Sequence, residues 1–164
     1  MDEVTAEALA PLSVFVADDD EDMRDLVATT LRVDGHSVVE ATDGLQLLHM
    51  LDLGLAGQIR AADVVLADVM MPRLSGLGVL EALHRAQTKP PVILMTVLID
   101  RSVHVVARRL GGAGVLFKPF DADALRRTLA RVWLGRAPSQ PPGPSTQEQA
   151  LLARSDATQL RHGR

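Results

Sequence analysis

Five short apolar runs rich in Val, Leu and Ile constrain the fold of this chain more than any other feature. Most of them are continuous rather than alternating, which is the pattern of strands that are buried on both faces of a parallel sheet. Each run is four to six residues long, a usual length for such a strand. The predicted strands span residues 13–17, 37–41, 63–67, 91–96 and 114–117.

Segments with helical periodicity follow these runs, and most begin after a residue suited to cap a helix. Asp43, Ser75, Asp100 and Asp121 are the candidate N-caps, because their side-chain oxygens can accept a backbone N–H of the first turn. Helices are predicted over residues 23–31, 45–51, 77–86, 103–110 and 125–133, with residues 52–62 as a long connection. Strand and helix thus alternate, and right-handed crossovers place helices on both faces of the sheet. We expect an α/β fold, a flavodoxin-like (βα)5 three-layer sandwich with strand order 2-1-3-4-5.

Size and charge limit the classes of function. A chain of 164 residues, 47% of them hydrophobic, suits one domain with a sizeable core and leaves no room for a second full domain. Aromatic residues make up only 2%, and residues 1–134 carry 13 basic against 19 acidic side chains. Both facts argue against DNA binding by this chain, which needs positive charge and often stacking platforms.

The compartment is predicted from what the sequence lacks. There is no cysteine, so a disulfide framework or a thiolate metal site is impossible. The first residues are acidic and have neither the basic nor the apolar segment of a secretory signal, and no apolar run approaches the length of a membrane span. We therefore expect a cytoplasmic protein without a membrane anchor.

Composition also predicts the domain limits. Residues 1–11 form an N-terminal extension and residues 12–134 the folded domain. Residues 135–146 read GRAPSQPPGPST, a composition typical of an extended linker. Residues 147–164 form a tail, either one short helix or a disordered segment, and they are too few for a DNA-binding output domain. A single-domain protein is expected, and the linker and tail are also consistent with a piece of a longer one.

Polar residues follow several predicted strands at the point where each strand ends. Asp18 and Asp19 follow the first, Asp68 the third, Thr96 the fourth and Lys118 the fifth. Because the carboxyl ends of parallel strands meet at one edge of a sheet, these side chains are expected to share a site. Clustered carboxylates repel one another, and a hard cation such as Mg²⁺, which prefers oxygen ligands, relieves the repulsion.

Each of these residues also has a purely structural interpretation. An acidic run at a helix start commonly complements the helix dipole, and we expect Asp20, Glu21 and Asp22 to do only that. A lone Asp68 would be an ordinary turn residue and a lone Thr96 an ordinary strand residue. The functional interpretation depends on all the fragments occurring together, in order, at strand ends. The histidines lack metal-ligand spacing and are expected to be solvated: His36, His49, His84, His104 and His162.

The segment that begins at Asp68 reads DVMMPRLSG. Its D-x-x-x-P-x-x-x-G pattern resembles the phosphoacceptor loop of the receiver domains of two-component response regulators. The acidic pair, the threonine that ends the fourth strand and the Lys118–Pro119 pair match the same family. The resemblance covers about residues 12–134.

This resemblance implies a phosphoacceptor protein rather than an enzyme with turnover. Asp19, Asp68 and the backbone carbonyl of Met70 would bind Mg²⁺, with Asp18 acting through a water molecule. Asp68 would accept a phosphoryl group from a phosphohistidine of a histidine kinase or histidine phosphotransfer protein. Lys118 and the Thr96 hydroxyl would bind the phosphoryl oxygens. The signal would then pass to an unknown downstream protein, with homodimerisation possible, and the family implies a cis bond before Pro119.

Two positions are atypical of the family. Val97 stands where a small residue is usual, so it is expected to narrow access to Asp68 and to slow reaction with small phosphodonors. Val115 stands where an aromatic residue usually takes part in switching, and Phe117 is expected on the opposite face. The apolar side chains of Met70 and Leu98 cannot orient an attacking water, which predicts a long-lived phosphoryl state.

Two alternatives remain open from the sequence. The first is a small Mg²⁺-dependent phosphatase that uses an aspartyl phosphate, which would normally need a second acid where Met70 stands. The second is a receiver-shaped scaffold that is not phosphorylated, an alternative that Val97 and Val115 keep open.

Overall fold

One sheet of parallel strands forms the centre of the molecule in the computed structural model, which describes residues 9–86 and 89–135. Its strands lie in the order β2-β1-β3-β4-β5, as predicted. Every neighbouring pair is parallel. The strands are β1 (Ser13–Ala17), β2 (Ser37–Ala41), β3 (Val64–Asp68), β4 (Val92–Thr96) and β5 (Gly114–Phe117).

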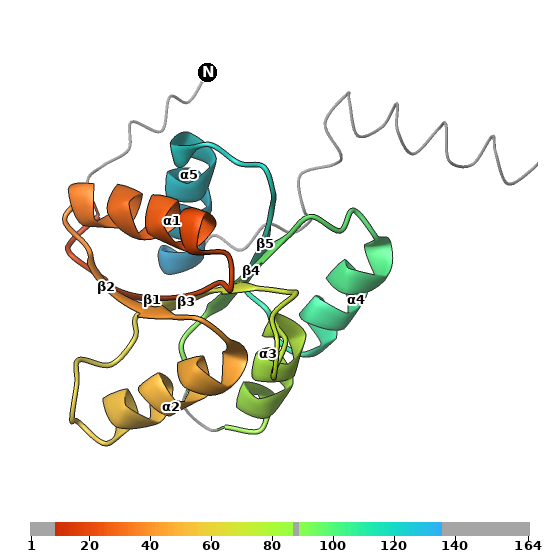
Figure 1. The fold of residues 1–164 in the computed structure, drawn as a ribbon, viewed down its shortest axis with the longest axis horizontal. Coiled ribbons are helices and arrows are strands. Elements are labelled where there is room, and N and C mark those ends of the chain that lie inside the picture. Colours follow the sequence, from red (N-terminus) through yellow and green to blue (C-terminus); the bar gives the residue numbers. More distant parts are fainter. Residues whose placement is uncertain (1–8, 87–88, 136–164) are drawn as a thin grey trace, which may run out of the picture.

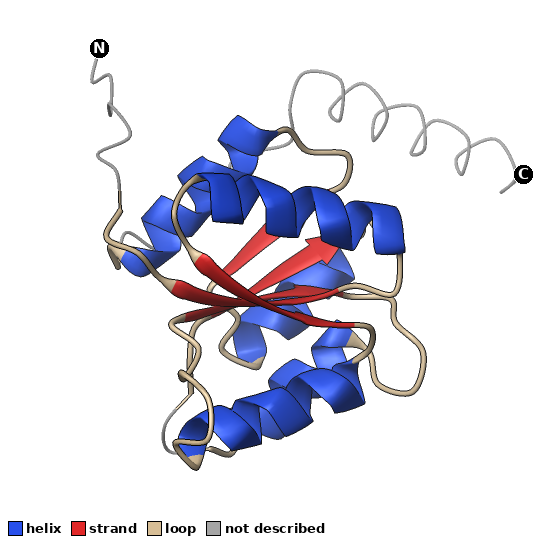
Figure 2. Ribbon diagram, turned by 60° about the vertical axis from the view of Figure 1, so that its left-hand side comes forward, coloured by secondary structure: helices blue, strands red, loops and turns tan. Residues whose placement is uncertain are grey.

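Helices form a layer on each face of this sheet (Figure 1), and Figure 2 shows the sheet between the two layers. Helices α1 and α5 lie on one face, and α2, α3 and α4 lie on the other. The helices are α1 (Glu21–Val33), α2 (Gly44–Leu55), α3 (Gly76–His84), α4 (Arg101–Arg109) and α5 (Ala122–Trp133). The flavodoxin-like α/β fold is therefore confirmed.

Two apolar clusters hold the layers together, and they divide each strand by alternation. Phe15 and Leu94 point to the layer of α2, α3 and α4, whereas Val14 and Ile93 point to the layer of α1 and α5. All four side chains are fully buried. Burial on both faces explains why the strands read as continuous apolar runs.

The predicted N-caps are confirmed for the helices that follow Asp43, Ser75, Asp100 and Asp121. Each side-chain oxygen accepts a backbone N–H of the first turn at 2.7–3.0 Å. Asp20 does the same for α1, where its carboxylate accepts the Met23 N–H at 3.1 Å. The first turn of each of these helices is therefore fixed by a local hydrogen bond.

Most helix boundaries and two of the strands differ from the prediction by one to four residues. Strand β3 includes Asp68, and α3 ends at His84 rather than at residue 86. Helix α2 continues through residues 52–55, so the long connection is shorter than expected. A Cβ placed on Gly54 would lie 3.0 Å from the Ala61 Cα, so the remaining connection packs back against the helix.

The expectation that all histidines are solvated is wrong for His36. Its side chain is buried, and its Nδ1 accepts the Leu12 N–H at 3.1 Å, at the start of β1. His49 and His84 are exposed, and His162 lies outside the described residues. His36 directly precedes β2, and its contact with the residue before the neighbouring strand β1 accompanies its burial.

The segments outside the described residues include most of the N-terminal extension, nearly all of the linker and the whole tail. The predictions for residues 1–8 and 136–164 therefore stay predictions. Among the described helices, none combines the length and the apolar character that a membrane crossing requires.

Candidate functional site

The residues that end or follow four parallel strands converge at one edge of the sheet. Asp18 follows β1, Asp68 ends β3, Thr96 ends β4 and Lys118 follows β5. The Lys118 Nζ lies 2.6 Å from Asp18 Oδ2 and 2.8 Å from Asp68 Oδ2. One ammonium group thus bridges two carboxylates that are 50 residues apart in the chain.

A third carboxylate completes an acidic cluster. One carboxylate oxygen from each of Asp18, Asp19 and Asp68 lies within 4.8 Å of the others. Asp18 is fully buried and Asp68 is buried, whereas Asp19 is exposed. The donors are all oxygens, as Mg²⁺ prefers, and the exposed Asp19 leaves the cluster accessible from solvent. The residues therefore fit a hard divalent cation.

Burial and hydrogen bonding shift the pKa values of Asp18 and Lys118. Desolvation raises the pKa of the Asp18 carboxyl, and the hydrogen bonds from Lys118 and the Asp20 N–H offset only part of this effect. Desolvation by itself would lower the pKa of the Lys118 ammonium, but its hydrogen bonds to Asp18 and Asp68 outweigh that effect and raise the pKa. Lys118 is therefore a permanent cation in the site.

The Asp68 side chain is buried. Its Oδ2 accepts from Lys118, and its Oδ1 accepts the Met70 N–H at 3.1 Å. The start of helix α3 lies directly against the Asp68 backbone. A Cβ on Gly76 would lie only 2.3 Å from the Asp68 carbonyl oxygen. Gly76 is the first residue of α3, and the requirement for glycine is a close backbone approach rather than a loop conformation.

Thr96 connects the ends of β4 and β5. Its side chain is buried, and its Oγ1 accepts the Leu98 N–H at 2.9 Å. Its carbonyl oxygen accepts the Lys118 N–H at 2.8 Å. The Thr96 hydroxyl proton stays available for a second partner, and the Lys118–Pro119 bond is cis, as expected.

Apolar side chains from two loops are exposed after the strand ends that carry Asp68 and Thr96. Met70 in the β3–α3 loop is 59% exposed, and Val97 in the β4–α4 loop is 60% exposed. Leu98 and Ile99 are also exposed. Together these four residues form what we call the apolar rim.

The prediction that Phe117 faces away from Val115 is wrong. Residues two apart in a strand share a face, and both side chains are on the side of α4. Val115 packs against the cluster that contains the α4 residue Val103, and the Phe117 ring lies 5.0 Å from the His104 ring of α4. The aromatic residue on this face of β5 is thus next to Lys118 in sequence rather than three residues before it.

One contact of the phosphoacceptor-like loop was not predicted. Arg73, whose φ is 65°, forms an ion pair with the Asp43 carboxylate, which is only 2% exposed. The Gln46 N–H and Arg73 hold the pKa of Asp43 below its usual range. The Gly44 N–H also donates to the Leu74 carbonyl at 3.2 Å. The start of α2 therefore anchors the loop between β3 and α3.

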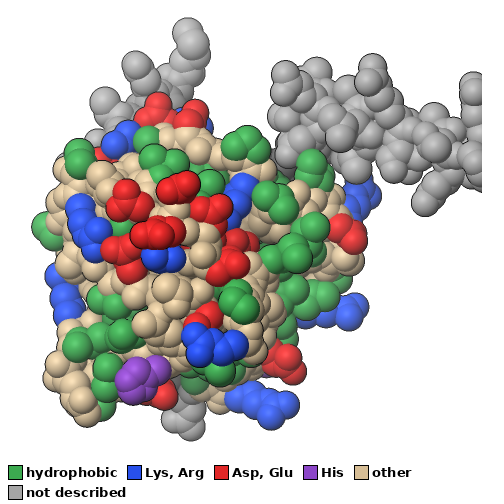
Figure 3. Space-filling model, in the orientation of Figure 1, with side chains coloured by type: hydrophobic (Ala, Val, Ile, Leu, Met, Phe, Trp, Pro, Cys, Tyr) green, Lys and Arg blue, Asp and Glu red, His purple; other side chains and the backbone are tan. Residues whose placement is uncertain are grey.

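Acidic side chains also gather on the surface around the start of α1. Figure 3 shows them on the face that Figure 1 presents. Exposed members include Asp19, Asp20, Glu21, Asp22 and Asp25. A negative surface of this kind attracts cations and positively charged partners.

The fold and these residues define a flavodoxin-like α/β domain with an acidic, lysine-bridged site at the carboxyl edge of its sheet. The family model for the response regulator receiver domain matches residues 14–130, and the chain belongs to this family.

Curated and solved relatives agree with this assignment. The chain is 34% identical to the response regulator protein FleR of Pseudomonas aeruginosa over 162 residues, covering 92% of this chain and 33% of that protein. Among solved structures, the chemotaxis response regulator CheY4 of Vibrio cholerae matches with a TM-score of 0.66 and 29% identity, covering 75% of this chain and 99% of the other. The BeF3-activated DrrB receiver domain has a TM-score of 0.64 and 25% identity, covering 77% and 100% of the two chains.

The curated relatives are longer than this chain. It covers 24% of the regulatory protein AtoC of Escherichia coli and 48% of a probable transcriptional regulator of Cyanophora paradoxa. The assignment concerns the receiver domain.

Proposed function

We propose that this protein is a phosphoacceptor of a two-component pathway, in which Asp68 receives a phosphoryl group from a phosphohistidine. One observation carries the proposal. Lys118 bridges the buried Asp68 and Asp18 carboxylates at the edge where Asp19 and Thr96 also lie. This combination supplies a nucleophile, a metal-binding cluster and a cation for phosphoryl oxygens in one place.

Three side chains and one carbonyl would hold the metal. Asp19, Asp68 and the Met70 carbonyl are the proposed direct ligands, and Asp18 is proposed to act through a water molecule. When bound, Mg²⁺ would neutralise the charge on phosphoryl oxygens. The carboxylate oxygens of Asp18, Asp19 and Asp68, which lie within 4.8 Å of one another, support this proposal.

The chain's own residues carry the transfer. A carboxylate oxygen of Asp68 forms a bond to phosphorus while the P–N bond of the donor breaks, and the electron pair of that bond stays with the donor imidazole. Lys118 then directs its ammonium hydrogens to the phosphoryl oxygens instead of to both carboxylates. The Thr96 hydroxyl donates to another of these oxygens, for which its free proton is suited.

The partners follow from this chemistry. The donor would be a histidine kinase or a histidine phosphotransfer protein, and a downstream protein would bind the changed surface.

The apolar rim lacks a group that could orient a water molecule for attack on the phosphoryl group, which supports a long-lived phosphoryl state. Phosphoryl loss within seconds would contradict that part of the proposal. Whether the regulator is single-domain stays a prediction, since the chain spans only part of its curated relatives.

The phosphatase alternative is disfavoured by Met70. It occupies the position two residues after Asp68, where a second acid would be needed, and a thioether cannot transfer a proton. The scaffold alternative predicts an intact fold with no phosphoryl chemistry. The three possibilities therefore differ in a measurable outcome.

The test incubates the protein with Mg²⁺ and acetyl phosphate, with Asp68→Asn as the control. Covalent labelling that approaches one phosphoryl group per chain, absent in the control, supports the proposal. Multiple turnovers with release of inorganic phosphate would indicate the phosphatase. Neither labelling nor beryllofluoride binding in the wild-type protein would indicate the scaffold.

A further inference from the structure

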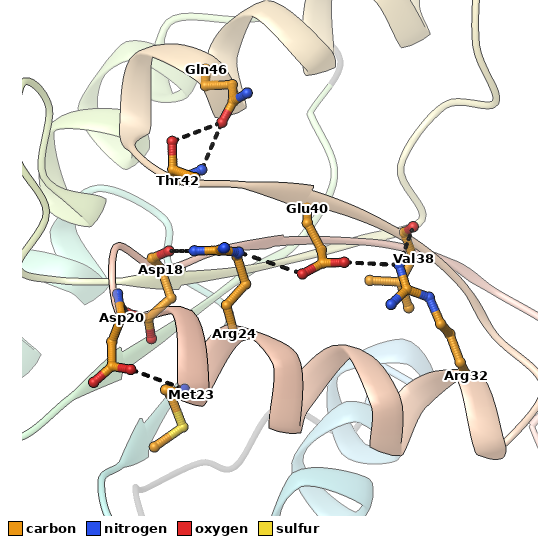
Figure 4. A network of polar contacts seen from close by, with 9 residues as sticks. All are labelled: Asp18, Asp20, Met23, Arg24, Arg32, Val38, Glu40, Thr42 and Gln46. Carbon is orange, nitrogen blue, oxygen red and sulfur yellow. Dashed lines mark hydrogen bonds and ion pairs between the residues drawn. The ribbon is translucent and has the colours of Figure 1, made fainter.

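A polar network behind the acidic cluster connects Asp18 with the edge strand β2 (Figure 4). Arg24, in the second turn of α1, donates from Nη1 to the Asp18 carbonyl oxygen at 2.9 Å. Its Nε lies 3.4 Å from the Glu40 Oε1, and Glu40 belongs to β2. The Arg24 side chain is only 14% exposed although it is charged. Burial of this kind requires fixed partners.

The peptide of Asp18 is held on both sides. Its N–H donates to the Ala41 carbonyl of β2 at 3.2 Å, and its carbonyl accepts from Arg24. Its Oδ1 accepts the Asp20 N–H at 3.0 Å, and Lys118 holds Oδ2. One methylene group joins the carboxylate to the Asp18 Cα. A fixed backbone at Asp18 therefore also limits where the carboxylate can lie.

Holding this peptide matters because neighbouring charges push the loop apart. Asp18 lies in a cluster with Asp19 and Asp68, and like charges at such distances repel. Without the Arg24 contact, the buried Asp18 carbonyl loses its hydrogen-bond donor, and the β1–α1 loop can relax away from the other carboxylates. The cluster would then be wider than a small cation requires.

We propose that Arg24 is a positioning residue for the Asp18 carboxylate, and that Glu40 directs Arg24 towards the Asp18 carbonyl. Arg24 does not touch the metal or the phosphoryl group in this scheme, and it acts through the backbone of Asp18. The inference rests on the proposed metal-dependent function.

The chain offers a matched control in the same helix. Arg32 pairs with the other oxygen of Glu40, with its Nη2 3.0 Å from Oε2. It forms no hydrogen bond or ion pair with Asp18 within the described residues. Arg24→Met and Arg32→Met therefore remove the same charge and one partner of the same glutamate. Only Arg24→Met removes the donor to the Asp18 carbonyl.

The experiment measures the Kd of Mg²⁺ alone by isothermal titration calorimetry, at a temperature where thermal unfolding shows every variant to be folded. Loss of a positioning contact behind a ligand typically weakens metal binding 10-fold to 100-fold, so we expect about 10-fold weaker binding for Arg24→Met. If Arg24 acted only through its positive charge, its removal would tighten Mg²⁺ binding, because a nearby positive charge repels the cation. The expected weakening therefore distinguishes the positioning role from a purely electrostatic effect. Arg32→Met is expected to change the Kd less than about twofold, since its side chain is nearly half exposed.

Two further variants keep the test informative if Arg24→Met does not fold. Arg24→Lys keeps the charge but cannot contact Asp18 and Glu40 together, so its Kd should lie between those of wild type and Arg24→Met. Glu40→Gln should weaken Mg²⁺ binding in the same direction as Arg24→Lys.

The outcomes separate this inference from the proposed function. If Arg24→Met and Arg24→Lys bind Mg²⁺ as tightly as Arg32→Met or more tightly, the positioning role is refuted, and the phosphoacceptor function stands. If wild type itself binds no Mg²⁺ and Asp68 is not labelled, both are overturned.

Discussion

At the scale of single residues, burial decides which side chains carry charge in and around the site. Asp18 is fully buried beside an ammonium and other carboxylates, and desolvation raises its pKa. The unfolded chain would lose that proton at lower pH, so this carboxylate destabilises the fold as pH rises above about 4. Functional sites often store such a cost, which a bound cation would offset.

His36 gives the fold a pH dependence of the opposite sign. Only a neutral ring can accept the Leu12 N–H, and burial lowers the His36 pKa, although nearby Asp34 opposes this. The unfolded state binds the proton more readily, so the free energy of unfolding should fall as pH drops below about 6.5 towards the lowered pKa. Above pH 6.5 the contribution is fully present.

Urea unfolding at pH 7.5 and 5.5 checks this prediction with His36→Gln and, as control, the exposed His49→Gln. At pH 7.5 the free energy of unfolding of His36→Gln should be about 1 kcal/mol lower than that of wild type, the usual value of one hydrogen bond. Between pH 7.5 and 5.5 this free energy should decrease less in His36→Gln than in wild type. His49→Gln should behave like wild type. A decrease in His36→Gln as large as in wild type would contradict the assignment.

Val97 is predicted to limit the reaction of Asp68 with small phosphodonors. It directly follows Thr96, and its branched side chain is 60% exposed in the apolar rim. Val97→Ala should raise the rate of acetyl phosphate labelling about threefold, which corresponds to roughly 0.6 kcal/mol of activation free energy. Val105→Ala, an exposed valine on α4, serves as control. An unchanged rate in Val97→Ala would rule out this role.

At the scale of elements, the start of α3 lies against the strand that carries Asp68. Gly76 has no room for a Cβ, which would meet the Asp68 carbonyl oxygen at 2.3 Å. Backbone cannot give way as a flexible side chain can, so Gly76→Ala should lower the free energy of unfolding by about 1–3 kcal/mol. Labelling of Asp68 should also slow, because its strand end must shift.

Gly114→Ala provides the matched control for this prediction. A Cβ on Gly114 meets nothing closer than 3.4 Å, an ordinary contact distance. Denaturant unfolding and acetyl phosphate labelling of both variants distinguish steric displacement from a general effect of losing glycine. Equal effects in the two variants would show that the close approach at Gly76 is not the cause.

At the scale of the whole molecule, the described core and the side chains packed against it extend from Leu9 to Val132. Because the composition of residues 135–146 predicts an extended linker, we expect a chain that ends at residue 135 to unfold within about 2 °C of the full chain, the shift that a change of less than about 0.5 kcal/mol gives. Thermal unfolding with and without Mg²⁺ measures this. A chain that ends at residue 128 loses the buried Leu129 of α5 and should not fold. A large decrease in the unfolding temperature of the chain that ends at residue 135 would show that later residues belong to the domain.

Much of the fold and of the site follows from local patterns. The strands, the N-caps and the meeting of Asp18, Asp68 and Lys118 were predictable, because strand periodicity and parallel topology place strand ends together. The side on which Phe117 lies also follows from strand alternation, because Phe117 and Val115 are two residues apart and share a face. Arg24 left only a faint signal, a single basic residue within an acidic segment.

The sequence by itself determined the secondary structure, the order of the strands and the set of residues at the carboxyl edge, because these depend on periodicity and on neighbours in the chain. Only the tertiary structure decided which groups are desolvated and what holds them. The burial of Asp68 and His36, the space denied to a Cβ at Gly76 and the contact of Arg24 with Asp18 depend on elements far apart in sequence. Desolvation and hydrogen bonding are properties of packed surroundings, so they become definite only when the layers come together.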